Sequence, residues 1–100
     1  MSMYCLAWKY KVSSNQAKFE EEYGRNGGWF KFFESSDDYL GSELMKHADG
    51  KTYILIDKWM SKADYQDFID ENKADYDQLN DQNKALYEEE EDLGEFDLMQ

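Results

Sequence analysis

A chain of 100 residues with 41% hydrophobic and 17% aromatic side chains can bury one core, which excludes an intrinsically disordered protein. The net charge of -12 arises in residues 64–100, which carry 14 acidic and 2 basic side chains, whereas residues 1–63 carry 9 of each. Such an acidic surface repels phosphate backbones and anionic lipids, which argues against nucleic acid or a membrane as partner.

Residues 1–100 are expected to form one domain, because the chain has the size of a single domain and shows no linker or internal repeat. Cys5 is the only cysteine, so an internal disulfide is not possible. The first residues lack the features of a signal peptide, and no segment has the roughly 20 apolar residues of a membrane span. We therefore expect a cytoplasmic protein in which Cys5 is a small buried hydrophobe.

The first predicted element is a strand over residues 3–12, because its side chains alternate between two faces. A helix follows, with Ser13 and Gln16 as a capping box and Ala17, Phe19 and Tyr23 as its apolar stripe. Three glycines within residues 24–28 predict a break in this helix, after which helical spacing resumes up to residue 34.

Two further strands are predicted over residues 39–47 and 52–60, joined by a hairpin turn at Asp49-Gly50. Ser61 with Asp64 three positions later is a helix-start signal. Apolar residues then recur at steps of three and four up to Leu86, which predicts one long or broken helix. We expect the acidic run 88–92 to end that helix and residues 93–99 to form a fourth strand.

This order, β-α-β-β-α-β, predicts an α+β ferredoxin-like fold with a four-stranded antiparallel sheet and helices on one face. The first strand carries apolar side chains on both faces, with Met3, Cys5 and Ala7 behind Leu6 and Trp8. A second copy of the chain would cover the remaining face, so we expect a homodimer.

Four segments in this order resemble the antibiotic biosynthesis monooxygenase family of dimeric α/β barrels. The segments are 19–24 with Gly28-Trp29, then 39–44, 53–59 and 61–65. The strongest element is Asp57 with Trp59 at the end of the third strand, followed by a capped helix with Tyr65 and Phe68. The likeness covers roughly residues 3–97.

The resemblance implies oxygenation or cleavage of electron-rich aromatic, quinol-type or haem substrates, often without metal or flavin, so no cofactor is expected. Dioxygen would react with a substrate anion in an apolar pocket between the sheet and the helices. A small aromatic molecule is then the expected ligand. The alternative is a non-catalytic dimeric barrel that binds a small apolar ligand or has a structural or stress role.

Trp59 matches the family tryptophan of the third strand, which makes it the first candidate to stack on a substrate; an ordinary core position is the alternative. Other aromatic side chains that could line the same space are Trp8, Tyr10, Tyr23, Trp29, Phe33 and Phe68. The oxygenase hypothesis requires a cavity of about 300 Å³ or more beside Trp59, whereas the alternative fills that space with Trp8, Trp29 and Phe68.

His47, the only histidine, could be a general base or haem ligand, or an exposed residue near the hairpin. Haem-degrading relatives pair their tryptophan with an asparagine on the first strand and a histidine on the last helix. Trp8 and Gln78 stand at or near these positions, which argues against haem degradation. Motifs for zinc, nucleotides or a catalytic cysteine are absent.

Overall fold

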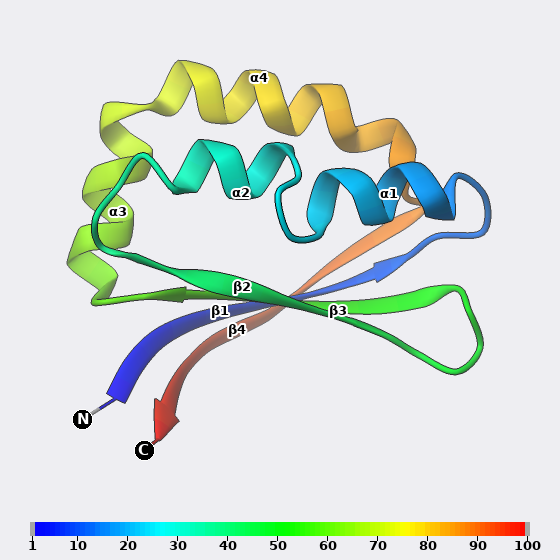
Figure 1. Ribbon diagram of the computed structural model, residues 1–100, viewed down its shortest axis with the longest axis horizontal. Helices are drawn as coiled ribbons and strands as arrows, with labels where there is room; N and C mark the ends of the chain where they lie inside the picture. The colour runs from blue at the N-terminus through cyan, green and yellow to red at the C-terminus, as the bar shows by residue number, and fades with distance from the viewer. Residues whose placement is uncertain (1, 100) are drawn as a thin grey trace.

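The computed structural model describes residues 2–99, which form one antiparallel sheet with helices on one of its faces (Figure 1). The strands are β1 Ser2–Lys11, β2 Tyr39–Lys46, β3 Thr52–Trp59 and β4 Glu89–Met99. The helices are α1 Gln16–Tyr23, α2 Gly28–Phe33, α3 Lys62–Glu71 and α4 Lys73–Asn83, followed by a 3-10 turn, η1 Lys84–Leu86. The strand order β2-β3-β1-β4 confirms the predicted ferredoxin-like fold.

The core lies between the helices and the two central strands. Tyr10 on β1 pairs with Tyr53 on β3, and both side chains are buried. Helix α1 packs on them, with the ring centroid of Phe19 5.2 Å from that of Tyr10 and 4.8 Å from that of Tyr53. The even positions of β1 and the odd positions of β3 therefore face the helices, as the alternation predicts.

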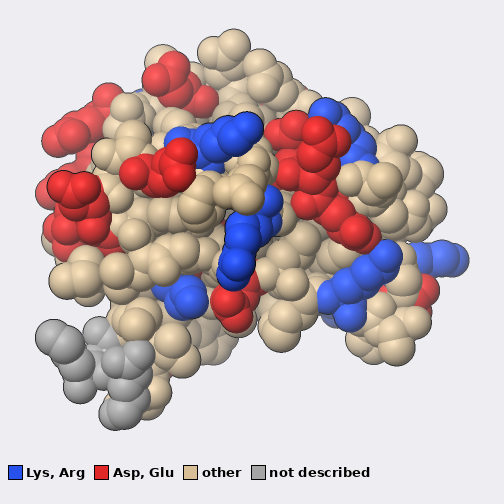
Figure 2. Space-filling model, viewed as in Figure 1, with Lys and Arg blue, Asp and Glu red and all other residues tan. Residues whose placement is uncertain are grey.

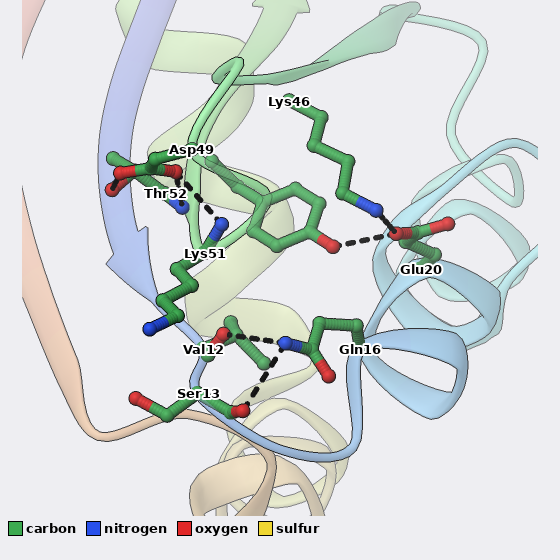
Figure 3. Close-up of polar contacts among 9 residues, drawn as sticks. Val12, Ser13, Gln16, Glu20, Lys46, Asp49, Lys51 and Thr52 are labelled. Atoms are coloured by element: carbon green, nitrogen blue, oxygen red, sulfur yellow. Dashed lines mark hydrogen bonds and ion pairs between the residues drawn. The ribbon is translucent and has the colours of Figure 1, made fainter.

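The predicted capping box at Ser13 is wrong. The N-cap of α1 is Asn15, whose φ of 65° is left-handed and whose side chain makes no capping hydrogen bond. Gln16 instead donates from Nε2 to the carbonyl oxygens of Val12 and Ser13, at 3.2 Å each (Figure 3). The backbone N–H of Ser13 is already used, because it donates to the Glu88 carboxylate at 2.7 Å.

The break between α1 and α2 is confirmed. The N–H of Gly27 donates to the carbonyl of Gly24 at 3.1 Å, and Asn26 between them has a φ of 68°. This closes a tight turn of the type that needs a left-handed residue in its third position. A Cβ atom at Gly27 would lie 2.3 Å from the Glu21 carbonyl oxygen, so only glycine allows this close contact with α1.

The long C-terminal helix is broken at Asn72, which has a φ of -120° and ψ of 29° and lies between α3 and α4. Its predicted start is confirmed, because the Ser61 hydroxyl accepts from the Asp64 N–H at 3.1 Å. Within residues 2–99, none of the helices combines the length and apolar character that crossing a membrane requires.

The expectation that the acidic run 88–92 ends a helix is wrong, because β4 already begins at Glu89. Across the ladder Glu89 lies opposite Lys11, and Glu91 opposite Lys9. Opposite charges in facing positions of two strands stabilise the pairing, which explains why this run extends as a strand.

The β1–β4 ladder contains a bulge, because its register shifts between Ala7 and Trp8. Ala7 lies opposite Gly94 and Trp8 opposite Asp92, so Leu93 is the extra residue. Gly94 has a φ of 102°, a conformation that other residues rarely adopt. Residues of β4 before and after the bulge therefore alternate in opposite phase.

The sheet face away from the helices carries exposed apolar side chains beside its charged ones within residues 2–99. Phe96, which lies opposite Cys5, is 53% exposed, and Met45, which lies opposite Ile54, is 50% exposed. Leu98 near the end of β4 is exposed as well. These side chains together form the open sheet face.

Candidate functional site

A buried carboxylate, Asp57, lies at the centre of the helix-facing side of the sheet. The alternation of β3 that buries Tyr53, Leu55 and Trp59 also points Asp57 inward, where only 7% of its surface is exposed. An acid at such a position is unusual, because burial disfavours its charged form. Asp57 is therefore the main candidate for a functional residue on this side of the sheet.

Polar neighbours hold the Asp57 carboxylate in place. Ser42 lies opposite Asp57 in the β2–β3 ladder, and its hydroxyl donates to Oδ1 at 2.6 Å. The Tyr39 hydroxyl is hydrogen-bonded to that of Ser42, which extends the chain of hydroxyl groups. Ser42 and Trp8 favour the ionised carboxylate, but burial has the larger effect and raises the pKa of Asp57 to about 6.

The tyrosines around Asp57 stay protonated at neutral pH. Burial raises the pKa of Tyr39 to about 12 and moves that of Tyr65 further above its ordinary range. The pKa of Tyr10 is also raised far above its ordinary value, by burial first and then by neighbours that include Tyr23 and Glu90. Among Asp57 and these tyrosines, Asp57 is the group whose pKa burial brings toward neutral pH.

A small cavity of about 60 Å³ lies beside Asp57, beneath α4. Its walls are mostly aromatic, and Tyr76 and Asn80 from α4 with Glu90 from β4 form the polar side. The predicted residues that the structure brings together here are Trp8, Tyr10, Tyr23, Trp29 and Phe33.

A larger groove of about 340 Å³ lies on the other side of Asp57, between the α1–α2 turn and β2. The cavity and the groove share Tyr23, Trp29, Leu55 and Asp57 as walls. The indole N–H of Trp29 is buried in this shared wall beside Tyr23 and makes no hydrogen bond of ordinary geometry among residues 2–99. The carboxylate of Asp57 can thus be reached from two sides.

Trp59 lies outside both spaces. It is 0% exposed and packs among aromatic side chains, with ring centroids 5.4 Å from Phe33 and 5.4 Å from Tyr65. Phe68 belongs to the same cluster, 5.5 Å from Trp59. Neither residue lines the cavity or the groove. Of the three residues that the non-catalytic alternative expects beside Trp59, Phe68 packs on it, whereas Trp8 and Trp29 line the cavity.

His47 lines neither the cavity nor the groove. It lies after β2 at the hairpin, its side chain is 65% exposed, and its Nδ1 accepts from the Asp49 N–H at 2.9 Å. Gln78 on α4 is exposed as well. Within residues 2–99, no group of three or more His, Cys, Asp or Glu side chains is arranged to hold a metal ion.

Asp57, Ser42 and Glu90 are absent from the residues that we predicted for the site. The sequence does contain one indication of Asp57 as a site residue, because it is an acid at an inward position of a strand that is otherwise apolar on that side. Ser42 falls on the inward face of the neighbouring strand, directly across from Asp57. Glu90 could not be predicted as a site residue, because the expectation that residues 88–92 end a helix gives Glu90 no inward position on the sheet.

No protein-family model matches the sequence, and no curated protein matches it. Solved structures do match the fold. SnoaB, a cofactor-independent oxygenase from Streptomyces nogalater, matches with a TM-score of 0.76 and 18% identity over 100% of this chain and 96% of that chain. The chain has the fold of the antibiotic biosynthesis monooxygenases.

Two further structures illustrate the range of this fold. A monooxygenase from the gene ActVA-Orf6 of Streptomyces coelicolor, in complex with nanaomycin D, has a TM-score of 0.68 and 14% identity over 99% of this chain and 88% of that chain. A dimeric ferredoxin-like protein from an uncultured marine organism has a TM-score of 0.65 and 10% identity, over 100% and 90%. At these identities the likeness concerns the fold.

Proposed function

We propose that this protein is a cofactor-independent monooxygenase of the antibiotic biosynthesis monooxygenase family that oxidises a small phenol or quinol. The observation that supports this proposal best is the buried carboxylate of Asp57, whose pKa is raised to about 6, between an aromatic cavity and a groove. A base with a pKa near the working pH and a water-poor surrounding suits the removal of a phenolic proton.

In the proposed reaction Asp57 takes the proton of the phenolic O–H group. The resulting phenolate is rich in electrons and reacts with dioxygen at a ring carbon. One oxygen atom stays on that carbon as a new carbonyl, and the other leaves as water with the ring proton and the proton held by Asp57. The four electrons that reduce dioxygen come from the substrate, so a phenol and dioxygen give a quinone and water.

The dimensions of the two spaces support this assignment of roles. A groove of about 340 Å³ lies within the range of pockets that hold small organic ligands. The cavity of about 60 Å³ has room for one or two molecules the size of water or dioxygen. The indole N–H of Trp29 could donate to an anionic oxygen formed between them.

Oxygen uptake with hydroxynaphthalenes tests the proposal. Wild-type protein and the Asp57→Asn variant would be compared in the same assay, with Asp67→Asn as a control that removes one exposed acid on α3. We expect turnover in the wild type and the control and a loss of at least about 100-fold in Asp57→Asn, the usual contribution of a general base. Equal rates in all three proteins would refute the role of Asp57.

We also propose that the open sheet face pairs with that of a second copy; one of the structures with this fold is described as a dimeric ferredoxin-like protein. The exposed side chains of Met45, Phe96 and Leu98 support this arrangement, because a monomer rarely leaves such a face in water. Light scattering of wild type and a Phe96→Glu variant tests it. A wild-type protein of monomer mass at micromolar concentration would contradict the dimer.

A second candidate is a non-catalytic barrel that binds a small apolar ligand, with a structural or stress role. The packing of Trp59 against Phe33 and Tyr65 favours it, because that indole borders neither the cavity nor the groove. Ligand binding without oxygen uptake, measured by calorimetry on the same compounds, would favour this candidate over the oxygenase.

A further inference from the structure

Arg25 is the only arginine of the chain and lies at the groove that leads to Asp57. It also borders the neighbouring hollow along β2. Arginine presents a planar fork of N–H donors that matches the two oxygens of a carboxylate. An arginine at a groove can therefore bind the carboxylate group of a ligand.

The backbone that carries Arg25 is tightly held. Arg25 and Asn26 are the two central residues of the turn closed by the hydrogen bond from Gly27 N–H to the Gly24 carbonyl. Gly24 in turn donates to the Glu20 carbonyl at 2.9 Å, and Gly27 has no space for a Cβ atom. The turn is therefore fixed on the end of α1, and Arg25 is carried at a defined place beside the groove.

The charge of Arg25 is also available, although three glutamates precede it closely. Lys46 pairs with Glu20 at 2.8 Å, which Figure 3 shows, and Lys18 pairs with Glu22 at 3.2 Å and with Glu21 at 3.9 Å. Lysines thus engage all three acids. Arg25 makes no ion pair within the described residues 2–99.

Arg25 is the cation of the groove that has no acidic partner among residues 2–99. Lys58 and Glu43, which also border the groove, pair with one another at 4.0 Å. Asp57 is buried at the inner wall. Although the protein carries a net charge of -12, basic and acidic side chains are interspersed across the middle of the face in Figure 2, so this face is not uniformly negative.

We propose that the substrate is a hydroxyaromatic carboxylate, bound with its carboxylate group on Arg25 and its hydroxyl group toward Asp57. This inference rests on the proposed function and specifies its substrate class. A group of opposite charge at the mouth of the groove offsets the repulsion between an anionic ligand and an acidic protein. It also fixes which end of the ligand enters first, since the carboxylate avoids the buried acid.

A matched pair of probes tests this inference by binding alone: 6-hydroxy-2-naphthoate and its methyl ester. The two have the same rings and the same hydroxyl group, and only the acid carries a charge. Titration calorimetry would be run on wild type, Arg25→Gln and a control, Lys84→Gln, which removes a cation on η1 that pairs with the exposed Asp81. Both variants lose one positive charge, so they have the same net charge.

We expect the acid to bind about tenfold more weakly to Arg25→Gln than to wild type, as for the loss of one charge-assisted contact at an exposed site. The ester should bind all three proteins equally, and Lys84→Gln should bind the acid as the wild type does. Raising the salt concentration should weaken binding of the acid but not of the ester. An Arg25→Lys variant should recover part of the lost affinity, because it keeps the charge without the fork.

Equal affinity of wild type and Arg25→Gln for the acid would overturn the inference. An equal loss of acid and ester binding in Arg25→Gln would overturn it too, because Arg25 would then only support the turn. In either case oxygen uptake on neutral hydroxynaphthalenes, and its loss in Asp57→Asn, still reports on the proposed function separately.

Discussion

Replacing Asp57 with asparagine should make the protein more stable at neutral pH while it removes the base. The pKa of Asp57 rises from its ordinary value of 3.8 to about 6 in the folded protein, mainly because the carboxyl is buried. A difference of about 2 pKa units corresponds to about 3 kcal/mol at pH values above both pKa values. Asparagine has nearly the same shape and keeps an oxygen that can accept from Ser42.

The sign follows from proton binding. Because the folded-state pKa of Asp57 lies above the unfolded-state value, the folded protein holds the proton more tightly between pH 4 and 6. The contribution of Asp57 to the free energy of unfolding is therefore largest below pH 4 and falls as the pH rises through 6. The variant lacks this fall, so its advantage over wild type should be near zero at pH 4 and grow to about 3 kcal/mol by pH 7.5.

Urea unfolding followed by tryptophan fluorescence, at several pH values between 4 and 7.5, measures this difference. The other carboxylates titrate in both proteins, so their effects cancel when the two free energies of unfolding are subtracted. A difference between the free energies of unfolding of wild type and Asp57→Asn that stays constant from pH 4 to 7.5 would refute the reasoning. They would show that the carboxyl has an ordinary pKa and is not shielded from water.

Three further changes test other parts of the structure. Asp49→Asn should lower the thermal midpoint at pH 7, with a difference that vanishes as the pH falls to about 2, because hydrogen bonds from the hairpin backbone lower the pKa of Asp49 to about 2; a pH-independent difference would contradict this. Trp59→Ala should cost about 3 to 5 kcal/mol by leaving a cavity in the core. It should hardly change the affinity for hydroxynaphthalenes, and a tenfold loss in calorimetry would restore Trp59 as a stacking residue. Ser61→Ala should cost about 1 kcal/mol in urea unfolding by removing the cap of α3, whereas Ser61→Thr should cost less.

The sequence predicted the strands well because their signal is local. Alternation located β1 and β3 to within one residue, and the Ser61 cap and the glycine break between α1 and α2 were also predicted. The run 88–92 was misassigned because its preference for a strand depends on Lys9 and Lys11, which lie about 80 residues away in sequence and directly across the ladder. A window of neighbouring residues does not contain that information.

The site was predicted only in part for a similar reason. Aromatic residues such as Trp8 and Trp29 could be chosen by type, and the structure does place them in one wall. The chemistry of Asp57 depends instead on burial, which comes from helices that pack on the strand after the whole chain has folded. Trp59 shows the opposite case, in which the residue type and position suggested a site residue. Its large neighbours Phe33, Tyr65 and Phe68 pack around the indole, so Trp59 lies in the core.

The bulge at Leu93 has a consequence for both surfaces of the sheet. In a regular strand Glu90 and Phe96 would point to the same side, since six positions separate them. The extra residue lets Glu90 reach the cavity, where it accepts from the Tyr10 hydroxyl at 2.8 Å, while Phe96 points to the open face. Deleting Leu93 would leave Glu90 and Phe96 five positions apart, so a regular strand would keep them on opposite sides without a bulge. Moving the extra residue to a place outside the segment between Glu90 and Phe96 would instead send one of the two side chains to the wrong side.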